Sequence, residues 1–99
     1  YRVAEYAVRS RGVATNTSMM APYRGVSRPM LTLAMETLMD RAAARLGVDR
    51  VEIRRRNLVT GFPHRTPTGL VLDESSYVES MAAAVGLADL PAFRARQAA

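Results

Sequence analysis

One amphipathic segment constrains the fold of this chain more than any other feature of its sequence. Between residues 29 and 46, apolar side chains recur every three or four positions, which is the spacing of one face of an α-helix. A glycine follows at residue 47, as is common just after the last residue of a helix. The pattern predicts a helix over residues 29–46. Its expected inward-facing side is formed by Leu31, Met35, Leu38, Ala42 and Leu46, and it is broadened by Ala34, Met39 and Ala43.

The residues before this helix predict an extended segment followed by a loop. Residues 1–18 contain apolar side chains in partial alternation, and Gly12 suggests a bend between two short strands. Prolines and a glycine then interrupt any regular ladder. We expect a loop over residues 19–29, with Ser27 as the N-cap of the helix and Pro29 in its first turn.

A capping box predicts a short second helix. Asp49 is followed three residues later by Glu52, a pattern in which the two side chains bind backbone N–H groups at a helix start. We expect this helix to run from about residue 50 to residue 57. Residues 60–69 contain two prolines and two glycines, which predicts an irregular segment. A very short strand is expected at residues 70–72.

Two more helices are expected in the rest of the chain. Ser76 and Glu79 form a second capping box, and Gly86 is expected to end the helix that begins there. Asp89 then caps a fourth helix, which has a proline in its first turn and Phe93 facing inward. The expected fold class is therefore α+β, with a short N-terminal extended segment or hairpin followed by three to four helices.

Composition removes several classes of function. The 99 residues contain no cysteine, which excludes disulfides, thiolate metal sites and a cysteine nucleophile in this chain. The single histidine, His64, has no evident nucleophile or orienting carboxylate beside it, so we expect no catalytic role. Asp73 and Glu74 are most simply the negative charge favoured before a helix. We expect no membrane span, because the apolar runs are short, and a cytoplasmic location.

The basic charge permits two interpretations. The net charge is +5, and all 14 basic residues are arginines. Arginine binds phosphates through paired hydrogen bonds, which would suit nucleic acid, whereas a GC-rich genome also enriches arginine. Arg54, Arg55 and Arg56 form the only run, and no aromatic residue flanks it, which favours a solvated helix face. A nucleic-acid-binding module and an interaction domain that uses the Leu31–Leu46 stripe are kept as alternatives.

The loop at residues 21–29 is the segment best suited to binding a ligand. It contains Gly25 and two arginines, and it leads into the start of the predicted helix. Unpaired backbone N–H groups and the helix dipole at such a junction favour an anion or a polar ligand. A simple connector with surface arginines is the alternative interpretation.

Four motifs occur in the chain in a specific order and at specific separations. Thr15–Thr17 and then residues 21–29 are similar to TNT…AYRGxGRP, and residues 36–40 are similar to E-x-L-M-D. Residues 48–58 are similar to (I/L)-D-P-x-E-L-R-R-R-N-L, and residues 66–70 to TPTG. Together they resemble the xanthine dehydrogenase and aldehyde oxidase family of molybdenum hydroxylases, which includes the large subunit of aerobic carbon monoxide dehydrogenase. The resemblance covers nearly the whole chain.

The resemblance implies that this chain is an internal slice of a large molybdopterin-binding subunit. Such enzymes hydroxylate aldehydes, N-heterocycles or similar small substrates with water-derived oxygen, and electrons leave through iron–sulfur and flavin subunits or domains. The implied cofactor is molybdopterin, in its simple or a dinucleotide form. Within the slice we expect an extended segment (1–18), a cofactor-side loop (19–29) and a helical part (29–99). Isolated from the remainder of the subunit, the piece is expected to be inactive, to hold no cofactor and to self-associate.

The resemblance also assigns roles to four residues of the loop. Tyr23, Arg24 and Gly25 match the family's loop beside the molybdenum centre, where backbone amides help to hold the cofactor. Val26 matches a position that faces the substrate and is aromatic in xanthine oxidoreductases. Because valine cannot stack on a flat ring, a purine substrate is not expected. The loop also lacks the cysteine that holds copper in carbon monoxide dehydrogenases. No catalytic residue and no metal ligand is expected in this chain.

Overall fold

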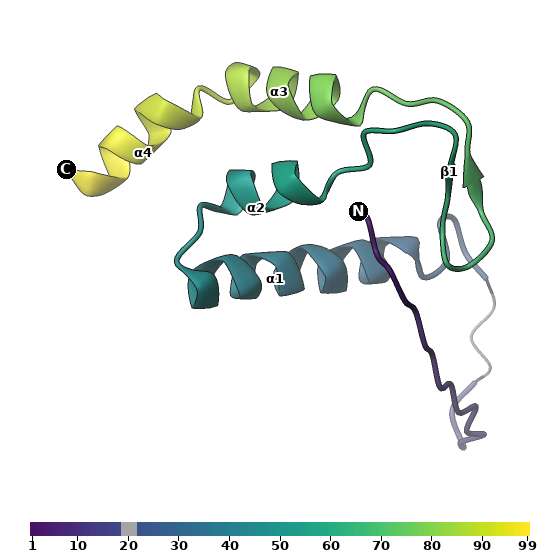
Figure 1. The fold of residues 1–99 in the computed structure, drawn as a ribbon. Helices are drawn as coiled ribbons and strands as arrows, with labels where there is room; N and C mark the ends of the chain where they lie inside the picture. Colours follow the sequence, from purple (N-terminus) through teal and green to yellow (C-terminus); the bar gives the residue numbers. More distant parts are fainter. Residues whose placement is uncertain (19–21) are drawn as a thin grey trace. The chain divides into compact units, whose positions relative to one another are not determined.

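A computed structural model describes residues 1–18 and 22–99 of the chain. The remaining three residues, which belong to the predicted loop, lie outside the described part. Two compact units are present, residues 6–53 and residues 1–5 with 54–99, and their boundary falls within the second helix. The mixture of helices with a small sheet confirms the α+β class at that level. The elements, in chain order (Figure 1), are α1 (Arg28–Leu46), α2 (Arg50–Asn57), β1 (His64–Arg65), β2 (Val71–Leu72), α3 (Tyr77–Leu87) and α4 (Leu90–Ala98).

The predicted first helix is confirmed as α1, which begins at Arg28 and ends at Leu46. Gly47 follows with φ 64°, in the left-handed conformation that suits a residue without a Cβ atom. Ser27 occupies the N-cap position, but its hydroxyl makes no capping hydrogen bond. The backbone of Ser27 is already helical (φ −88°, ψ −2°), whereas a capping side chain needs an extended backbone. The predicted hydroxyl cap is therefore wrong.

The predicted inward-facing side of α1 is largely uncovered. Leu31 and Leu38 are 62% and 60% exposed, whereas Ala43 is fully buried. Ala43 was expected to broaden the stripe, and it lies about 100° further around the helix than Ala42. The backbone N–H of Val48 donates to the carbonyl oxygen of Ala43 (3.0 Å), which closes the C-terminal turn of α1. In this chain by itself, the predicted burial is therefore confirmed for Ala43 and wrong for the larger side chains of the stripe, which are Leu31, Met35, Leu38 and Leu46.

The described residues have very little core. The buried hydrophobic side chains among them are Ala43, Ile53 and Val59, and no polar or charged residue among them is buried. Burial of apolar surface is the main favourable term in folding, so three side chains contribute little against the entropy of ordering the chain. The helices of the described part thus carry many exposed apolar side chains.

The N-terminal segment contains no strand, so the alternative of a hairpin within residues 1–18 is wrong. A strand persists only where a neighbour completes its hydrogen bonds, and the described residues offer it no such ladder. Its first residues instead reach the C-terminal end of α2. The backbone N–H of Arg2 donates to the carbonyl oxygen of Asn57 (2.8 Å), and the guanidinium of Arg2 donates to that of Arg56 (3.0 Å).

A small antiparallel hairpin replaces part of the predicted irregular segment. His64 pairs with Leu72, and Arg65 pairs with Val71. This confirms the short strand expected at residues 70–72 and corrects the expectation for residues 60–69, two of which form β1. The physical reason lies in the turn, where Gly69 has φ 87° and its N–H donates to the carbonyl oxygen of Thr66 (2.9 Å), which brings the two strands into register.

The start and the end of α3 differ from the predicted caps. Ser76 occupies the N-cap position without capping, because its hydroxyl pairs with the hydroxyl of Ser80 (3.1 Å). Gly86 lies inside α3, which ends at Leu87. The helix continues through Gly86 because no left-handed turn forms there, and Ala88 follows with a right-handed backbone (φ −75°, ψ −8°).

The predicted cap of α4 is confirmed, whereas its predicted inward-facing residue is not. The Asp89 side chain accepts a hydrogen bond from the backbone N–H of Ala92 (3.4 Å). Phe93 is 46% exposed, and the guanidinium of Arg96 lies 6.0 Å from its ring centroid. This cation–π contact covers one face of the ring in place of the core that the sequence suggested.

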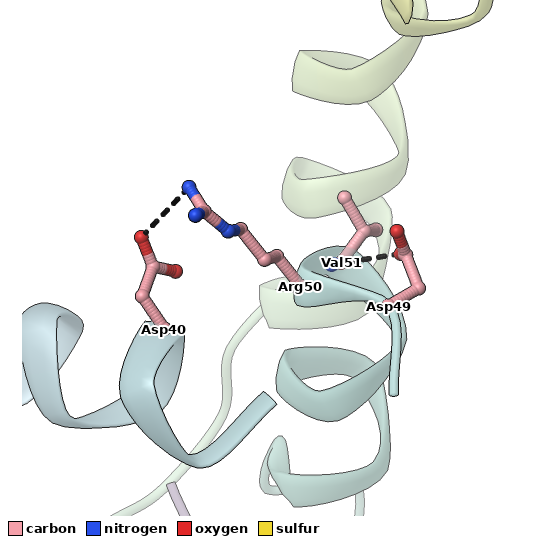
Figure 2. A network of polar contacts seen from close by, with 4 residues as sticks. All are labelled: Asp40, Asp49, Arg50 and Val51. Atoms are coloured by element: carbon pink, nitrogen blue, oxygen red, sulfur yellow. Dashed lines mark hydrogen bonds and ion pairs between the residues drawn. The ribbon is translucent and has the colours of Figure 1, made fainter. Parts of the chain in front are cut away.

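Polar contacts hold the turn between α1 and α2 (Figure 2). The Asp49 carboxylate accepts hydrogen bonds from the backbone N–H groups of Val51 (2.9 Å) and Glu52 (3.0 Å), which confirms Asp49 as the cap of α2. The Arg50 guanidinium lies 3.3 Å from the Asp40 carboxylate of α1. These contacts determine where α2 begins.

Replacing Asp49 by alanine is expected to loosen α2. Loss of an N-cap costs about 1 kcal/mol, so hydrogen exchange of the α2 amides should become roughly fivefold faster. The matched control is Asp40→Ala, which breaks the ion pair with the exposed Arg50 guanidinium, leaves the cap in place and should change exchange by less than this. Exchange mass spectrometry of the 99-residue chain measures both. Equal effects of the two substitutions would contradict a capping role.

Candidate functional site

A tight turn of residues 22–27 leads into α1. The backbone N–H of Val26 donates to the carbonyl oxygen of Tyr23 (2.7 Å), and the N–H of Arg28 donates to that of Gly25 (2.9 Å). Gly25 (φ 80°) and Val26 (φ 49°) both have positive φ. Two successive left-handed residues reverse the chain sharply, so Tyr23, Gly25 and Val26 are all exposed at the start of the helix.

Glycine is required at residue 25 by the backbone and not by lack of space. A Cβ atom built there would lie 3.7 Å from Cδ of Pro29, which is ordinary van der Waals contact. A side chain would nevertheless clash with its own backbone at a φ of 80°. The site therefore depends on the conformation that only glycine adopts freely.

Val26 is the strained residue of the turn, and sequence reasoning missed this. A β-branched residue with positive φ is an outlier, and a left-handed backbone costs a non-glycine residue about 1–2 kcal/mol. Its side chain is 63% exposed, so packing within the described chain does not impose this conformation. Strain of this kind concentrates at ligand sites. No sequence signal could have found it, since valine argues against a left-handed position.

The turn presents several hydrogen-bond donors to its surroundings. The backbone N–H groups of Arg24, Gly25 and Ser27 find no acceptor among the residues that the structure describes, and neither does the Arg24 guanidinium. Tyr23 is 83% exposed beside them. Donors clustered ahead of a helix N-terminus suit a ligand rich in acceptor oxygens and nitrogens or carrying negative charge. The structure thus brings the four predicted residues, Tyr23 to Val26, into one short turn.

The other residues considered in the sequence all belong to the unit formed by residues 1–5 and 54–99. His64 is half-buried in β1, and Arg54, Arg55 and Arg56 form the last turn of α2. Asp73 and Glu74 are exposed ahead of α3, and Glu74 lines an open hollow with Ser75, Ser76 and Glu79. Within residues 1–18 and 22–99, no group of three or more histidine, aspartate or glutamate side chains could hold a metal ion.

Residues 1–58 match the family described as the molybdopterin cofactor-binding domain. This segment contains the whole turn and all of α1. The chain belongs to the molybdopterin cofactor-binding domain family. The family and the cofactor inferred from the sequence motifs, molybdopterin, are thereby confirmed.

Several members of this family and one solved structure are similar to the chain. The large subunit of nicotine 6-hydroxylase from Paenarthrobacter nicotinovorans is 44% identical over 94 residues, which are 95% of this chain and 11% of that protein. The carbon monoxide dehydrogenase large chain from Hydrogenophaga pseudoflava is 34% identical over 66% of this chain and 8% of that protein. The crystal structure of quinoline 2-oxidoreductase from Pseudomonas putida 86 matches with a TM-score of 0.60 and 42% identity, over 66% of this chain and 8% of that chain.

The chain spans about a tenth of the length of the curated relatives that it matches. These comparisons offer no support to the nucleic-acid alternative suggested by the arginines. The described part of this family member contains no helix that is long and apolar enough to cross a bilayer. A cytoplasmic location stays a prediction.

Proposed function

We propose that this chain is an internal part of the molybdopterin-binding large subunit of a molybdenum hydroxylase. One observation carries the proposal: the segment that matches the cofactor-binding family contains an exposed, strained turn ahead of α1, and its backbone donors find no acceptor among the described residues. The names of the relatives, which include a hydroxylase large subunit, support the same class of enzyme. Since the chain spans about a tenth of such a subunit, the rest of the active site would come from other segments.

We propose that residues 19–29 form the cofactor-side loop, between an N-terminal segment (1–18) and a helical part (29–99). The described part of this loop fits molybdopterin, whose phosphate and pterin ring offer many hydrogen-bond acceptors. The backbone N–H groups of Arg24 and Gly25 would bind such acceptors, and the missing Cβ atom of Gly25 allows the close approach that backbone hydrogen bonds need. Tyr23 would lie beside the cofactor.

The proposed reaction is the hydroxylation of a C–H bond with oxygen derived from water, which releases two protons and two electrons. When bound, the molybdenum cofactor supplies the redox chemistry by accepting the electron pair. Partner subunits or domains with iron–sulfur clusters and flavin would carry the electrons away, since a chain without cysteine cannot hold a thiolate-bound cluster. The residues of this chain contribute binding and orientation, and none of them is proposed as the catalytic base.

We propose that Val26 lines the substrate pocket. Its side chain is exposed, which leaves it free to contact a bound molecule. A branched aliphatic side chain shapes a pocket through van der Waals contact and cannot stack on a purine as an aromatic ring would. The proposed substrate is an aldehyde, an N-heterocycle or a similar small molecule. The names of relatives that act on nicotine and quinoline support the N-heterocycle.

Metal analysis after gel filtration tests this function. The full-length protein that contains these residues should elute with stoichiometric molybdenum, whereas the isolated 99 residues should retain none and show no activity. The turn alone offers a few hydrogen bonds of about 0.5–1.5 kcal/mol each, too little to hold a ligand against dilution. The isolated chain should also self-associate through its uncovered apolar sides. A full-length protein without molybdenum, or a monomeric 99-residue chain with it, would contradict the proposal.

A further inference from the structure

The N-terminal half of α1 carries apolar side chains on opposite sides. From Pro29 to Met35 the sequence contains no charged residue, whereas two acidic residues and two arginines follow in the second half of the helix. Leu31 and Leu33 are 62% and 69% exposed. Residues two positions apart on an α-helix lie about 160° from each other around the axis. These two leucines therefore project from nearly opposite sides of α1.

The methionines extend this surface around the helix. Met30 and Met35 are 66% and 42% exposed, and five positions separate two side chains by about 140°. A helix that is hydrophobic on all sides is typically a buried one, whereas a surface helix has a single apolar stripe. Neighbours on at least two sides are therefore needed to remove this half of α1 from water.

We infer that residues 29–35 of α1 are enclosed on all sides by further segments of the same polypeptide. This inference rests on the proposed function, because it requires a large subunit around this chain. A second copy is a poorer occupant, since a two-fold dimer brings one face of the helix against the same face of its partner. Such a dimer would cover Leu31 or Leu33 and leave the other in water.

The length of the relatives supports the same occupant. In the 44%-identical hydroxylase subunit, the region that corresponds to this chain is 11% of the polypeptide, so ample chain surrounds it.

Thiol labelling of the full-length protein tests the enclosure. Leu31→Cys and Leu33→Cys place probes on the two sides of α1, and Arg45→Cys is the control on its charged half. We expect both leucine-site thiols to react with a maleimide at least roughly 100-fold more slowly in the native protein than in urea, and the Arg45-site thiol to react less than about tenfold more slowly. Mass spectrometry of the labelled peptides identifies each site.

Each other outcome overturns the inference. A protected thiol at residue 31 with a reactive one at residue 33 would show one-sided packing. Protection lost on dilution would make the occupant a second copy, and protection present only in the assembled complex would make it a partner subunit. If a cysteine variant does not fold, the rate at which peroxide oxidises Met30 and Met35 in the unsubstituted protein measures the same protection from solvent. Molybdenum content, measured on the same samples, tests the proposed function separately, because protection needs no cofactor.

Discussion

Replacing Gly25 by valine is expected to remove most of the molybdenum from the full-length protein. Gly25 has φ 80°, a conformation that L side chains rarely adopt. A β-branched residue there costs at least about 1–2 kcal/mol, and Val26 beside it already holds a positive φ. The turn should escape this strain by changing its backbone, which moves the donors of Arg24 and Gly25 away from the cofactor. Molybdenum per subunit is the measurement, with activity as the second readout.

Two further substitutions make the Gly25 result specific. Gly12→Val is the matched control, because Gly12 has no positive φ and a Cβ atom there would meet nothing within 4 Å. It should keep full molybdenum content. Gly25→Asn should retain more molybdenum than Gly25→Val, since asparagine tolerates the left-handed region better than other residues. Full metal content and activity in Gly25→Val would contradict the assignment of this turn to the cofactor.

Replacing Leu38 by alanine should change stability little in the isolated chain and strongly in the full-length protein. Leu38 is 60% exposed in the described structure, and alanine is a good helix former. The free energy of unfolding of the 99-residue chain should therefore change by less than about 0.5 kcal/mol. In the full-length protein, where we expect other segments to cover this side chain, the loss of a buried leucine should cost about 2–4 kcal/mol.

Thermal unfolding and hydrogen exchange of α1 amides measure both effects of the Leu38 substitution. Arg41→Ala is the control, because an exposed arginine on the same helix should cost little in either form. A large loss of stability in the isolated chain would show that the apolar stripe is already covered there. No loss in the full-length protein would show that it stays in water.

Local sequence signals predicted the elements because they depend on neighbouring residues alone. The apolar period over residues 29–46 and the glycine after it located α1 to within one residue. Asp49 and Asp89 were predicted as caps, and both accept a backbone hydrogen bond within their own helix start. The serine caps failed for an equally local reason. The backbone of Ser27 is already helical, and the Ser76 hydroxyl pairs with the hydroxyl of Ser80.

The sequence by itself determined the family, the helix positions and the turn that carries Tyr23 to Val26. Motif order and helical periodicity depend on neighbouring residues, so they can be recognised without knowing which distant residues are in contact. Only the tertiary structure decided which side of α1 is covered. An apolar stripe indicates which side chains would gain by burial, whereas the three-dimensional arrangement decides which of them are covered. Here Ala43 is buried and Leu31 is exposed. The strained backbone of Val26 was also decided by the structure, since valine carries no signal for a left-handed conformation.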